Sequence, residues 1–333
     1  MKQFKILDCT IRDGGYYTDW TFDKQLVRNL VKSLDLDGVD IIELGYKSPI
    51  KGGPYRKCND GFITAILSGI YVKSKLCFMI DVKDYIKNKS IDYTLLNRVI
   101  QKSEKSPFSV CRIAAKSNEI KYLTDLYNNI SKKGYDVICN LMGVSLLSTK
   151  QITEFSHLAG KLKLEATYIA DSYGALYPND IKNIFKNSII TGIHTHDNLG
   201  LAFANCLAAI DEGAECIDGT VLGMGRGVGN VKTEQLLMHR NGNISCELLD
   251  VISSIKLLQN KYCWGQNTTY MFAGIHHVHP LYAQNINTSG ISNSNLKDAL
   301  SNLKNEITFD QEKLKPFLEQ KAVVVIPARY ITI

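Results

Sequence analysis

The segment Ile193–Gly200 carries two histidines, His194 and His196, in a strand-like run. Alternate side chains of a β-strand point to the same side, so both imidazoles should face one space. An acid, an amide and a glycine follow at once, and this pattern is typical of a divalent-metal site at the end of a strand. Two histidines alone do not complete a metal site, so a further ligand must come from elsewhere in the chain.

A carboxylate interrupts the apolar run near the start of the chain. Asp8 lies within the strand-like segment Lys5–Thr10, and Arg12 follows just past its end. A buried carboxylate without a partner is costly, and a metal ion is one partner that would retain it. We therefore expect Asp8 to share a metal with His194 and His196.

The composition is that of an ordinary soluble globular protein, because 45% of the 333 residues are hydrophobic and 22% are charged. The net charge of +6 is spread over interleaved acids and lysines, which argues against a nucleic-acid interface. No apolar run is long enough to span a membrane, and no signal-peptide pattern opens the chain. The nine cysteines lack paired short spacings, so we expect a reduced, cytoplasmic protein without disulfides.

Strand-like and helix-like segments alternate over residues 1–240. The predicted strands are Lys5–Thr10, Asp40–Tyr46, Leu76–Asp81, Ser109–Ala115, Asp136–Gly143, Leu164–Asp171, Ile189–His196 and Cys216–Val221. Eight such units favour an α/β fold of the (β/α)₈ TIM-barrel type. The rival, an open doubly wound sheet, is disfavoured because no Gly-x-Gly-x-x-Gly follows the first strand. We expect the barrel to span 1–240 and a small helical appendage to span 241–333, with the apolar run Ala322–Ile333 unassigned.

Active sites of such barrels lie at the carboxyl-terminal ends of the strands. The unusual polar residues of this chain fall at those ends: Asp8, Arg12, Glu43, Asp81, Arg112, Asn140, Asp171, His194 and His196. The starts of the predicted strands carry no comparable set. This asymmetry indicates an active site.

Three motifs, in this order, resemble those of the metal-dependent lyase and aldolase TIM barrels, the HMG-CoA lyase-like superfamily. They are Asp-Cys-Thr-Ile-Arg-Asp-Gly at 8–14, His-Thr-His-Asp-Asn at 194–198 and Gly-Met-Gly-Arg-Gly-Val-Gly-Asn at 223–230. That superfamily includes 3-hydroxy-3-methylglutaryl-CoA lyase, isopropylmalate synthase and 4-hydroxy-2-oxovalerate aldolase. Residues 168–174, 112–114 and the tail around 273–283 are most similar to the last of these branches.

The resemblance implies roles for five residues. Asp8, His194 and His196 would bind a divalent metal, and Asn230 would complete its shell. Arg12 would stabilise an enolate. The resemblance implies Mn²⁺ or Mg²⁺, and the mixed carboxylate and imidazole ligands are also compatible with Zn²⁺.

The remaining polar residues at the strand ends are expected to line the substrate site. They are Asp13, Glu43, Arg112, Asp171 and Ser172. By resemblance, Asp13 would orient Arg12 or the first loop. Glu43 is equally compatible with an acid of the barrel core, and Arg112 with an ion pair to Glu43 or Asp81.

The chain departs from the aldolase branch at two positions. Tyr16 stands where that branch carries a catalytic histidine, and the best tail alignment places His276 where it carries a tyrosine. We therefore expect Tyr16 and His276 to exchange the acid and base positions, with His277 as a competing choice. Ordinary packing of the histidines in this region is an open alternative.

The predicted function is a metal-dependent aldolase that cleaves or forms a 4-hydroxy-2-oxo acid through a pyruvate enolate and an aldehyde. The alternative is a Claisen-type acyl-CoA lyase or synthase of the same superfamily. A metal-bound scaffold without catalysis is disfavoured, because a scaffold does not need Arg12. The expected partners are a small 2-oxo acid, an aldehyde and, by frequency alone, a second copy of the chain. The divergent tail does not support the aldehyde dehydrogenase partner of the aldolase branch.

Overall fold

The computed structural model describes residues 3–289, 293–304, 306 and 309–318. Eight parallel strands close into a barrel in the order β1-β10-β9-β8-β7-β6-β3-β2. The strands are β1 (Lys5–Asp8), β2 (Ile41–Tyr46), β3 (Lys75–Asp81), β6 (Val110–Ala115), β7 (Asp136–Met142), β8 (Ala166–Asp171), β9 (Gly192–Thr195) and β10 (Cys216–Gly219). A small antiparallel hairpin pairs β4 (Ile86–Lys87) with β5 (Ser90–Ile91). The predicted (β/α)₈ barrel is confirmed, and every predicted strand overlaps an observed one.

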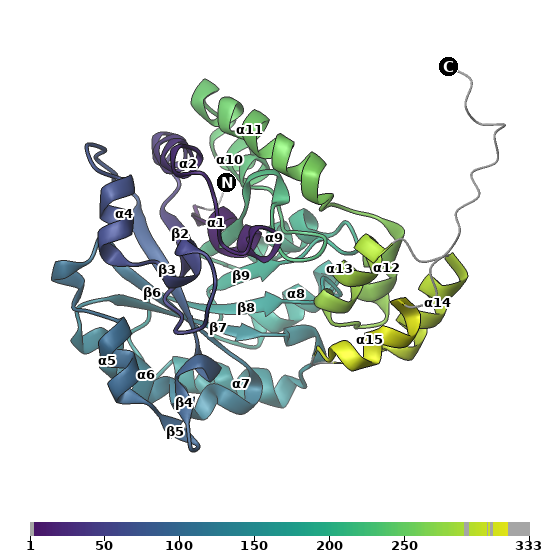
Figure 1. Ribbon diagram of the computed structural model, residues 1–333. Helices are drawn as coiled ribbons and strands as arrows, with labels where there is room; N and C mark the ends of the chain where they lie inside the picture. The colour runs from purple at the N-terminus through teal and green to yellow at the C-terminus, as the bar shows by residue number, and fades with distance from the viewer. Residues whose placement is uncertain (1–2, 290–292, 305, 307–308, 319–333) are drawn as a thin grey trace.

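Helices surround the barrel (Figure 1). They are α1 (Thr10–Thr18), α2 (Lys24–Leu36), α3 (Pro54–Lys57), α4 (Asp60–Ile66), α5 (Tyr93–Val99), α6 (Leu123–Lys132), α7 (Thr149–Ala159), α8 (Pro178–Lys186), α9 (Ala202–Asp211) and α10 (Thr233–Asn241). Short 3₁₀ helices lie at η1 (Val82–Tyr85), η2 (Ser103–Lys105), η3 (Ser117–Tyr122), η4 (Val144–Leu146) and η5 (Val221–Gly223). In α2, Asp23 caps the first turn by accepting from the Leu26 amide, and Val27, Leu30 and Leu34 are buried.

The pleat of the strands decides which polar side chains face the barrel interior. Leu7, Ile41, Val110 and Cys216 belong to one buried cluster inside the barrel. Side chains two residues along the same strand point the same way. The side chains that face the interior therefore include those of Cys9, Glu43, Arg112 and Asp218. Asp8 and Asp171 each lie one residue out of step with the interior positions of their strands, so their side chains point the other way.

Helix α1 was not expected from the sequence. It follows β1 directly and carries the segment from Arg12 to Tyr16. Gly14 and Gly15 lie inside this helix, where glycine is unfavourable by about 1 kcal/mol relative to alanine. A Cβ atom at Gly15 would lie 2.2 Å from the Trp20 ring, so the close packing of that ring requires the glycine.

Helix α11 (Cys246–Tyr262), which follows α10 in the chain, packs against α2 on the outside of the barrel. Its buried residues Leu248, Val251 and Ile255 belong to the main hydrophobic core. By packing, the barrel therefore includes this helix, which lies beyond the boundary expected at residue 240.

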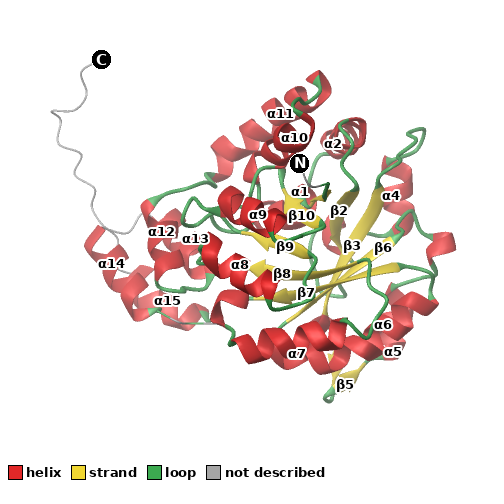
Figure 2. Ribbon diagram, turned by 180° about the vertical axis from the view of Figure 1, so that it is seen from behind, coloured by secondary structure: helices red, strands yellow, loops and turns green. Residues whose placement is uncertain are grey.

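Helices α12 (Thr268–Ile275), α13 (Pro280–Ser289), α14 (Asn293–Asn302) and α15 (Gln311–Leu318) gather at one side of the barrel (Figures 1 and 2). They have a hydrophobic cluster of their own, and it includes Val228 from the loop after β10. The helical appendage is thus anchored on the loop that follows the last barrel strand. The apolar run at 322–333 lies outside the described residues. Among the described helices, none combines the length and apolar character needed to cross a membrane.

Candidate metal centre and adjoining cavity

Three potential metal ligands meet inside the mouth of the barrel. A carboxylate oxygen of Asp13 and ring nitrogens of His194 and His196 lie within 4.8 Å of one another. Asp13 comes from α1, His194 from β9, and His196 directly follows β9. All three side chains are buried. The structure thus brings the two histidines into one space, with ring centroids 5.1 Å apart.

Asp8 does not belong to this group, contrary to expectation. One carboxylate oxygen accepts from the Thr10 amide at 3.0 Å, and the other accepts from the Thr10 hydroxyl at 3.0 Å and the Thr233 hydroxyl at 2.6 Å. Asp8 faces away from the barrel interior because its parity is opposite to that of Leu7. It joins the first turns of α1 and α10, and Asp13 takes the place expected for it in the ligand group.

Asn230 lies beside the ligand group. Its Nδ2 donates to Asp13 Oδ2 at 2.6 Å, while its Oδ1 is buried with no hydrogen-bond partner among the described residues. A backbone bridge pairs Asn230 with His196. A Cβ at Gly225 would lie 2.3 Å from Asn230 Nδ2 and 2.5 Å from Asp13 Oδ2. The glycine-rich loop 223–230 is therefore a tight turn that presents Asn230.

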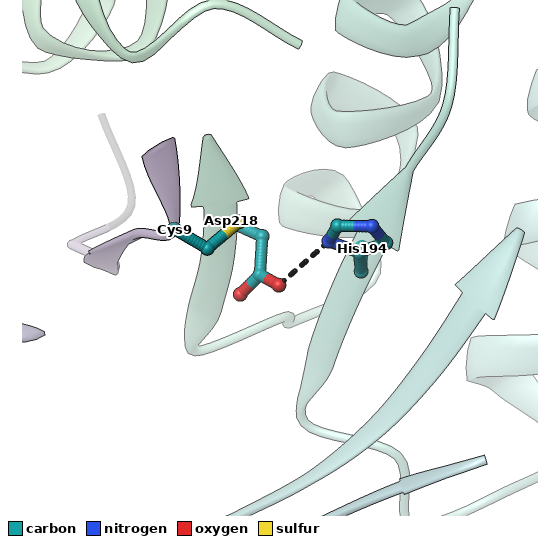
Figure 3. A group of neighbouring side chains, drawn as sticks. All are labelled: Cys9, His194 and Asp218. Atoms are coloured by element: carbon teal, nitrogen blue, oxygen red, sulfur yellow. Dashed lines mark hydrogen bonds and ion pairs between the residues drawn. The ribbon is translucent and has the colours of Figure 1, made fainter. Parts of the chain in front are cut away.

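A carboxylate that was not predicted lies behind His194 (Figure 3). His194 Nδ1 and Asp218 Oδ2 are 2.8 Å apart, and Arg112 Nη1 forms an ion pair with the same oxygen at 2.6 Å. Burial alone would raise the pKa of Asp218, but Arg112 and His194 hold it below its ordinary value. The ionised carboxylate can only accept, so Nδ1 donates and Nε2 remains available to a metal.

Arg12 is held in place by two carboxylates. Its Nε donates to Glu43 Oε2 at 2.6 Å, and its Nη1 donates to Asp13 Oδ1 at 2.6 Å. Glu43 is fully buried, so it positions Arg12 and does not line an open substrate site. Arg112, also fully buried, lies with its guanidinium carbon 4.3 Å from the Tyr168 ring centroid. Of the alternatives for Arg112, the structure shows ion pairs: one to Glu43 at 3.8 Å, as one alternative had it, and a shorter one to Asp218.

The charge states of the group suit a divalent cation. Burial holds the pKa of His196 well below its ordinary value, so the ring is neutral, which is the form that binds metals. Burial alone would raise the pKa of Asp13, but the positive charge of Arg12 holds it well below its usual range. The unpartnered Asn230 oxygen and the oriented ring of His194 add to this fit.

Asp171 ends β8 and Ser172 follows it, but the two side chains have different surroundings. The Asp171 oxygens accept from the amides of Ala175 and Leu176 at 3.1 and 3.0 Å, so this side chain closes its own loop and does not contact the ligand group. Ser172 Oγ accepts from the Gly143 amide at 3.0 Å and borders a cavity. Only Ser172 of this pair lies where a substrate-lining residue was expected.

The cavity has a volume of about 270 Å³ and opens at the carboxyl-terminal end of the strands. It is lined by Lys116, Ser117, Met142, Gly143, Leu146, Leu147, Gln151, Ser172, Tyr173, Arg226, His279 and Pro280. Arg226 lies next to Gly225, which packs against Asp13 and Asn230. The cavity therefore adjoins the ligand group through the glycine-rich loop.

Tyr16 lies one helical turn after Arg12 on α1, so the two side chains share a face of the helix. Its hydroxyl lies 3.3 Å from the Tyr46 hydroxyl. The Arg226 guanidinium carbon lies 5.5 Å from the Tyr16 ring centroid. Tyr16 thus shares a helix face with Arg12, the arginine expected to stabilise an enolate. Its ring also lies near Arg226, which borders the cavity.

The histidines of the appendage do not lie as expected. His276 follows α12 and stacks on Phe272 of the same helix, with ring centroids 5.8 Å apart. His277 has a left-handed backbone, with φ of 51°. Neither lines the cavity, whereas His279 does. Of these three histidines, His279 is therefore the one that lies at the cavity.

The chain is similar in sequence to known proteins. The family model described as HMGL-like matches residues 3–249. A 4-hydroxy-2-oxovalerate aldolase of Carboxydothermus hydrogenoformans is 31% identical over 247 residues, covering 71% of this chain and 70% of that protein. An oxaloacetate decarboxylase of Mycobacterium tuberculosis is 26% identical over 258 residues, covering 74% and 73%.

Two solved structures are similar in fold. The N-terminal domain of a protein described as a candidate aldolase from Bacteroides vulgatus has a TM-score of 0.73 at 27% identity, covering 86% of this chain and 97% of that one. An HMG-CoA lyase of Bacillus subtilis has a TM-score of 0.63 at 15% identity, covering 81% and 97%, which shows the fold alone. Because the family model spans the barrel from 3 to 249, and a relative at 31% identity matches over most of its length, the chain belongs to the HMGL-like family.

Proposed function

We propose that this protein is a divalent-metal-dependent aldolase that cleaves or forms a 4-hydroxy-2-oxo acid, with pyruvate and an aldehyde as the smaller partners. The observation that carries the proposal is the buried group of Asp13, His194 and His196 beside Arg12. Relatives named 4-hydroxy-2-oxovalerate aldolase support the assignment.

Asp13, His194 and His196 would hold the cation, with Asn230 Oδ1 as a further oxygen. Such a ligand set suits Mn²⁺ or Mg²⁺, and Zn²⁺ as well. When bound, the cation supplies Lewis-acid polarisation of the 2-oxo acid. The neutral imidazole of His196 and the ionised carboxylate of Asp13 are already in the protonation states that metal binding requires.

Arg12 supplies a fixed positive charge for the enolate. In cleavage, the proton leaves the 4-hydroxyl group, the bond between C3 and C4 breaks, and its electron pair forms the enolate of pyruvate as the aldehyde departs. A proton then adds at C3. Glu43 and Asp13 hold Arg12 in one orientation before the reaction, so its charge needs no reorganisation as the enolate forms.

Tyr16 is the group proposed to exchange the hydroxyl proton, and His279 is proposed to hold the oxygen that carries it. The Leu281 amide donates to His279 Nδ1 at 3.3 Å, so the neutral ring carries its own proton on Nε2. That N–H can donate a hydrogen bond to the aldehyde oxygen. The assignment of Tyr16 follows from its position on the Arg12 face of α1.

The relative named oxaloacetate decarboxylase favours a second candidate reaction, loss of carbon dioxide from a 2-oxo acid. Both reactions leave the same enolate, so the residues described above serve either one. The observation behind the acyl-CoA alternative is the similarity of fold to the HMG-CoA lyase structure.

The test is metal-dependent exchange of the methyl protons of pyruvate in D₂O, read by mass spectrometry with Mg²⁺ or Mn²⁺. We expect deuterium uptake that disappears with chelator and in Asp13→Asn. Asp136→Asn, an exposed carboxylate at the start of β7, is the matched control and should exchange like the wild type. An absence of exchange and of cleavage of any 4-hydroxy-2-oxo acid, with acetyl-CoA turnover instead, would establish the acyl-CoA alternative.

A further inference from the structure

We propose that the cavity beside the ligand group binds the far end of the acceptor aldehyde, and that this end carries an anionic group, a carboxylate or a phosphate, held by Arg226 and Lys116. This inference rests on the proposed aldolase function and names its substrate class. It concerns residues that lie outside the ligand group and outside the contacts of Arg12.

Arg226 has unused hydrogen-bonding capacity at the cavity wall. Its Nη2 donates to the Ser172 carbonyl at 3.4 Å, and its guanidinium lies over the Tyr16 ring. Its Nε is buried and has no hydrogen-bond partner among the described residues. A buried donor left unpaired costs about 1–3 kcal/mol, more when it is charged. A bound anion would supply the missing acceptor, and guanidinium groups bind carboxylate and phosphate in a two-pronged geometry.

The cavity is positively charged. Lys116 and Arg226 line it, and no acidic side chain does so among the residues that the structure describes. Neither cation forms an ion pair within that part of the chain, whereas the nearby Lys83 is paired with Asp81 at 2.8 Å. Burial, followed by the charges of Arg226, Lys116 and Lys83, lowers the pKa of His279 to about 3. Because His279 is neutral, the positive charges of Lys116 and Arg226 remain, and a bound anion would balance them.

The positions of the two arginines separate the two ends of the substrate. Arg12 contacts Asp13 and therefore serves the pyruvate end. Arg226 lines the cavity, and its guanidinium contacts the Ser172 carbonyl and lies over the Tyr16 ring. The wall formed by Met142, Leu146, Leu147 and Pro280 is apolar, which suits a short carbon chain between the aldehyde and the anion. The predicted acceptor is thus an aliphatic aldehyde with an anionic end.

The experiment measures kcat/KM for aldol addition of pyruvate to matched acceptors. The pairs are succinic semialdehyde against butanal and glyceraldehyde 3-phosphate against glyceraldehyde, so the two arms distinguish carboxylate from phosphate. We expect one anionic acceptor to exceed its neutral counterpart by about 10- to 100-fold, the range of a charge-assisted hydrogen bond. The anionic-to-neutral ratio should fall by a similar factor in Arg226→Met and less in Arg226→Lys and Lys116→Met. Lys73→Met, exposed before β3, should keep the wild-type ratio.

Pyruvate proton exchange, measured on the same samples, distinguishes the two proposals. Wild-type exchange together with ratios near one in both arms would overturn the anionic acceptor and leave the aldolase standing. Loss of exchange in Arg226→Met as severe as its loss of aldol addition would place Arg226 at the pyruvate end, and it would also overturn the inference. An absence of pyruvate proton exchange in the wild type would contradict both the aldolase function and the anionic acceptor.

Discussion

Asp218 accepts a hydrogen bond from His194 Nδ1 at 2.8 Å (Figure 3). The other ring nitrogen, Nε2, lies 3.9 Å from Asp13 Oδ2. The hydrogen bond to Asp218 fixes the ring orientation and leaves Nε2 for a metal. We expect Asp218→Asn to weaken Mn²⁺ binding by about 10- to 100-fold, since such partners of a ligating histidine contribute that much. Titration with Mn²⁺, following the free ion by electron paramagnetic resonance, measures this, and an unchanged affinity would show that the charge of Asp218 does not support metal binding.

The two aspartates of the first motif should behave differently. Asp13→Asn removes the charged oxygen from the ligand group, so metal binding should be lost. Asp8→Asn should keep one metal per chain but unfold more easily, by about 1–3 kcal/mol, because the amide nitrogen cannot accept from the hydroxyls of Thr10 and Thr233. Metal stoichiometry and thermal unfolding distinguish the two variants. Loss of metal in Asp8→Asn with retention in Asp13→Asn would restore the assignment made from the sequence.

The barrel could be predicted because apolar strands and helices alternate with regular spacing. The position of Asp8 could not, since a resemblance aligned the motif but did not say which residue faces inward. The alternation of side chains would have corrected this: Leu7 and Cys9 face the interior, so Asp8 between them cannot. The same argument applied to Cys216 identifies Asp218, which no motif marked.

The remaining parts of the site depend on packing that has no local signal. Gly14 and Gly15 argue against a helix, yet α1 forms because it packs closely on Trp20 and Met224. His279 reaches the cavity because the appendage is anchored through Val228 of the loop after β10. A contact between segments so distant in the chain could not be derived from spacing.

Arg12 is predicted to act on the reaction and not on metal affinity. Lysine cannot reproduce the contacts that Arg12 makes through two separate nitrogens, Nε to Glu43 and Nη1 to Asp13, because it lacks the planar fork of the guanidinium. We therefore expect Arg12→Lys to lower kcat for cleavage of a 4-hydroxy-2-oxo acid by about 10²–10³-fold, the cost of losing one preorganised donor to an oxyanion. Arg98→Lys, at an exposed site on α5, is the matched control. A rate near that of the wild type in Arg12→Lys would remove Arg12 from the chemistry.

His276 and His279 differ in whether they reach the cavity. His279 lines the cavity, and its Nε2 proton is available because Nδ1 accepts from Leu281. His279→Ala should therefore lower kcat for aldol cleavage by about 10²–10³-fold, as expected for a donor to the developing oxygen charge. His276→Ala should turn over like the wild type, because that ring stacks on Phe272 outside the cavity. Steady-state kinetics on both variants show which of the two histidines takes part in the reaction. If His276→Ala were the slower variant, the exchange of roles between Tyr16 and His276 expected from the sequence would be correct, and the appendage would have to move toward the barrel during turnover.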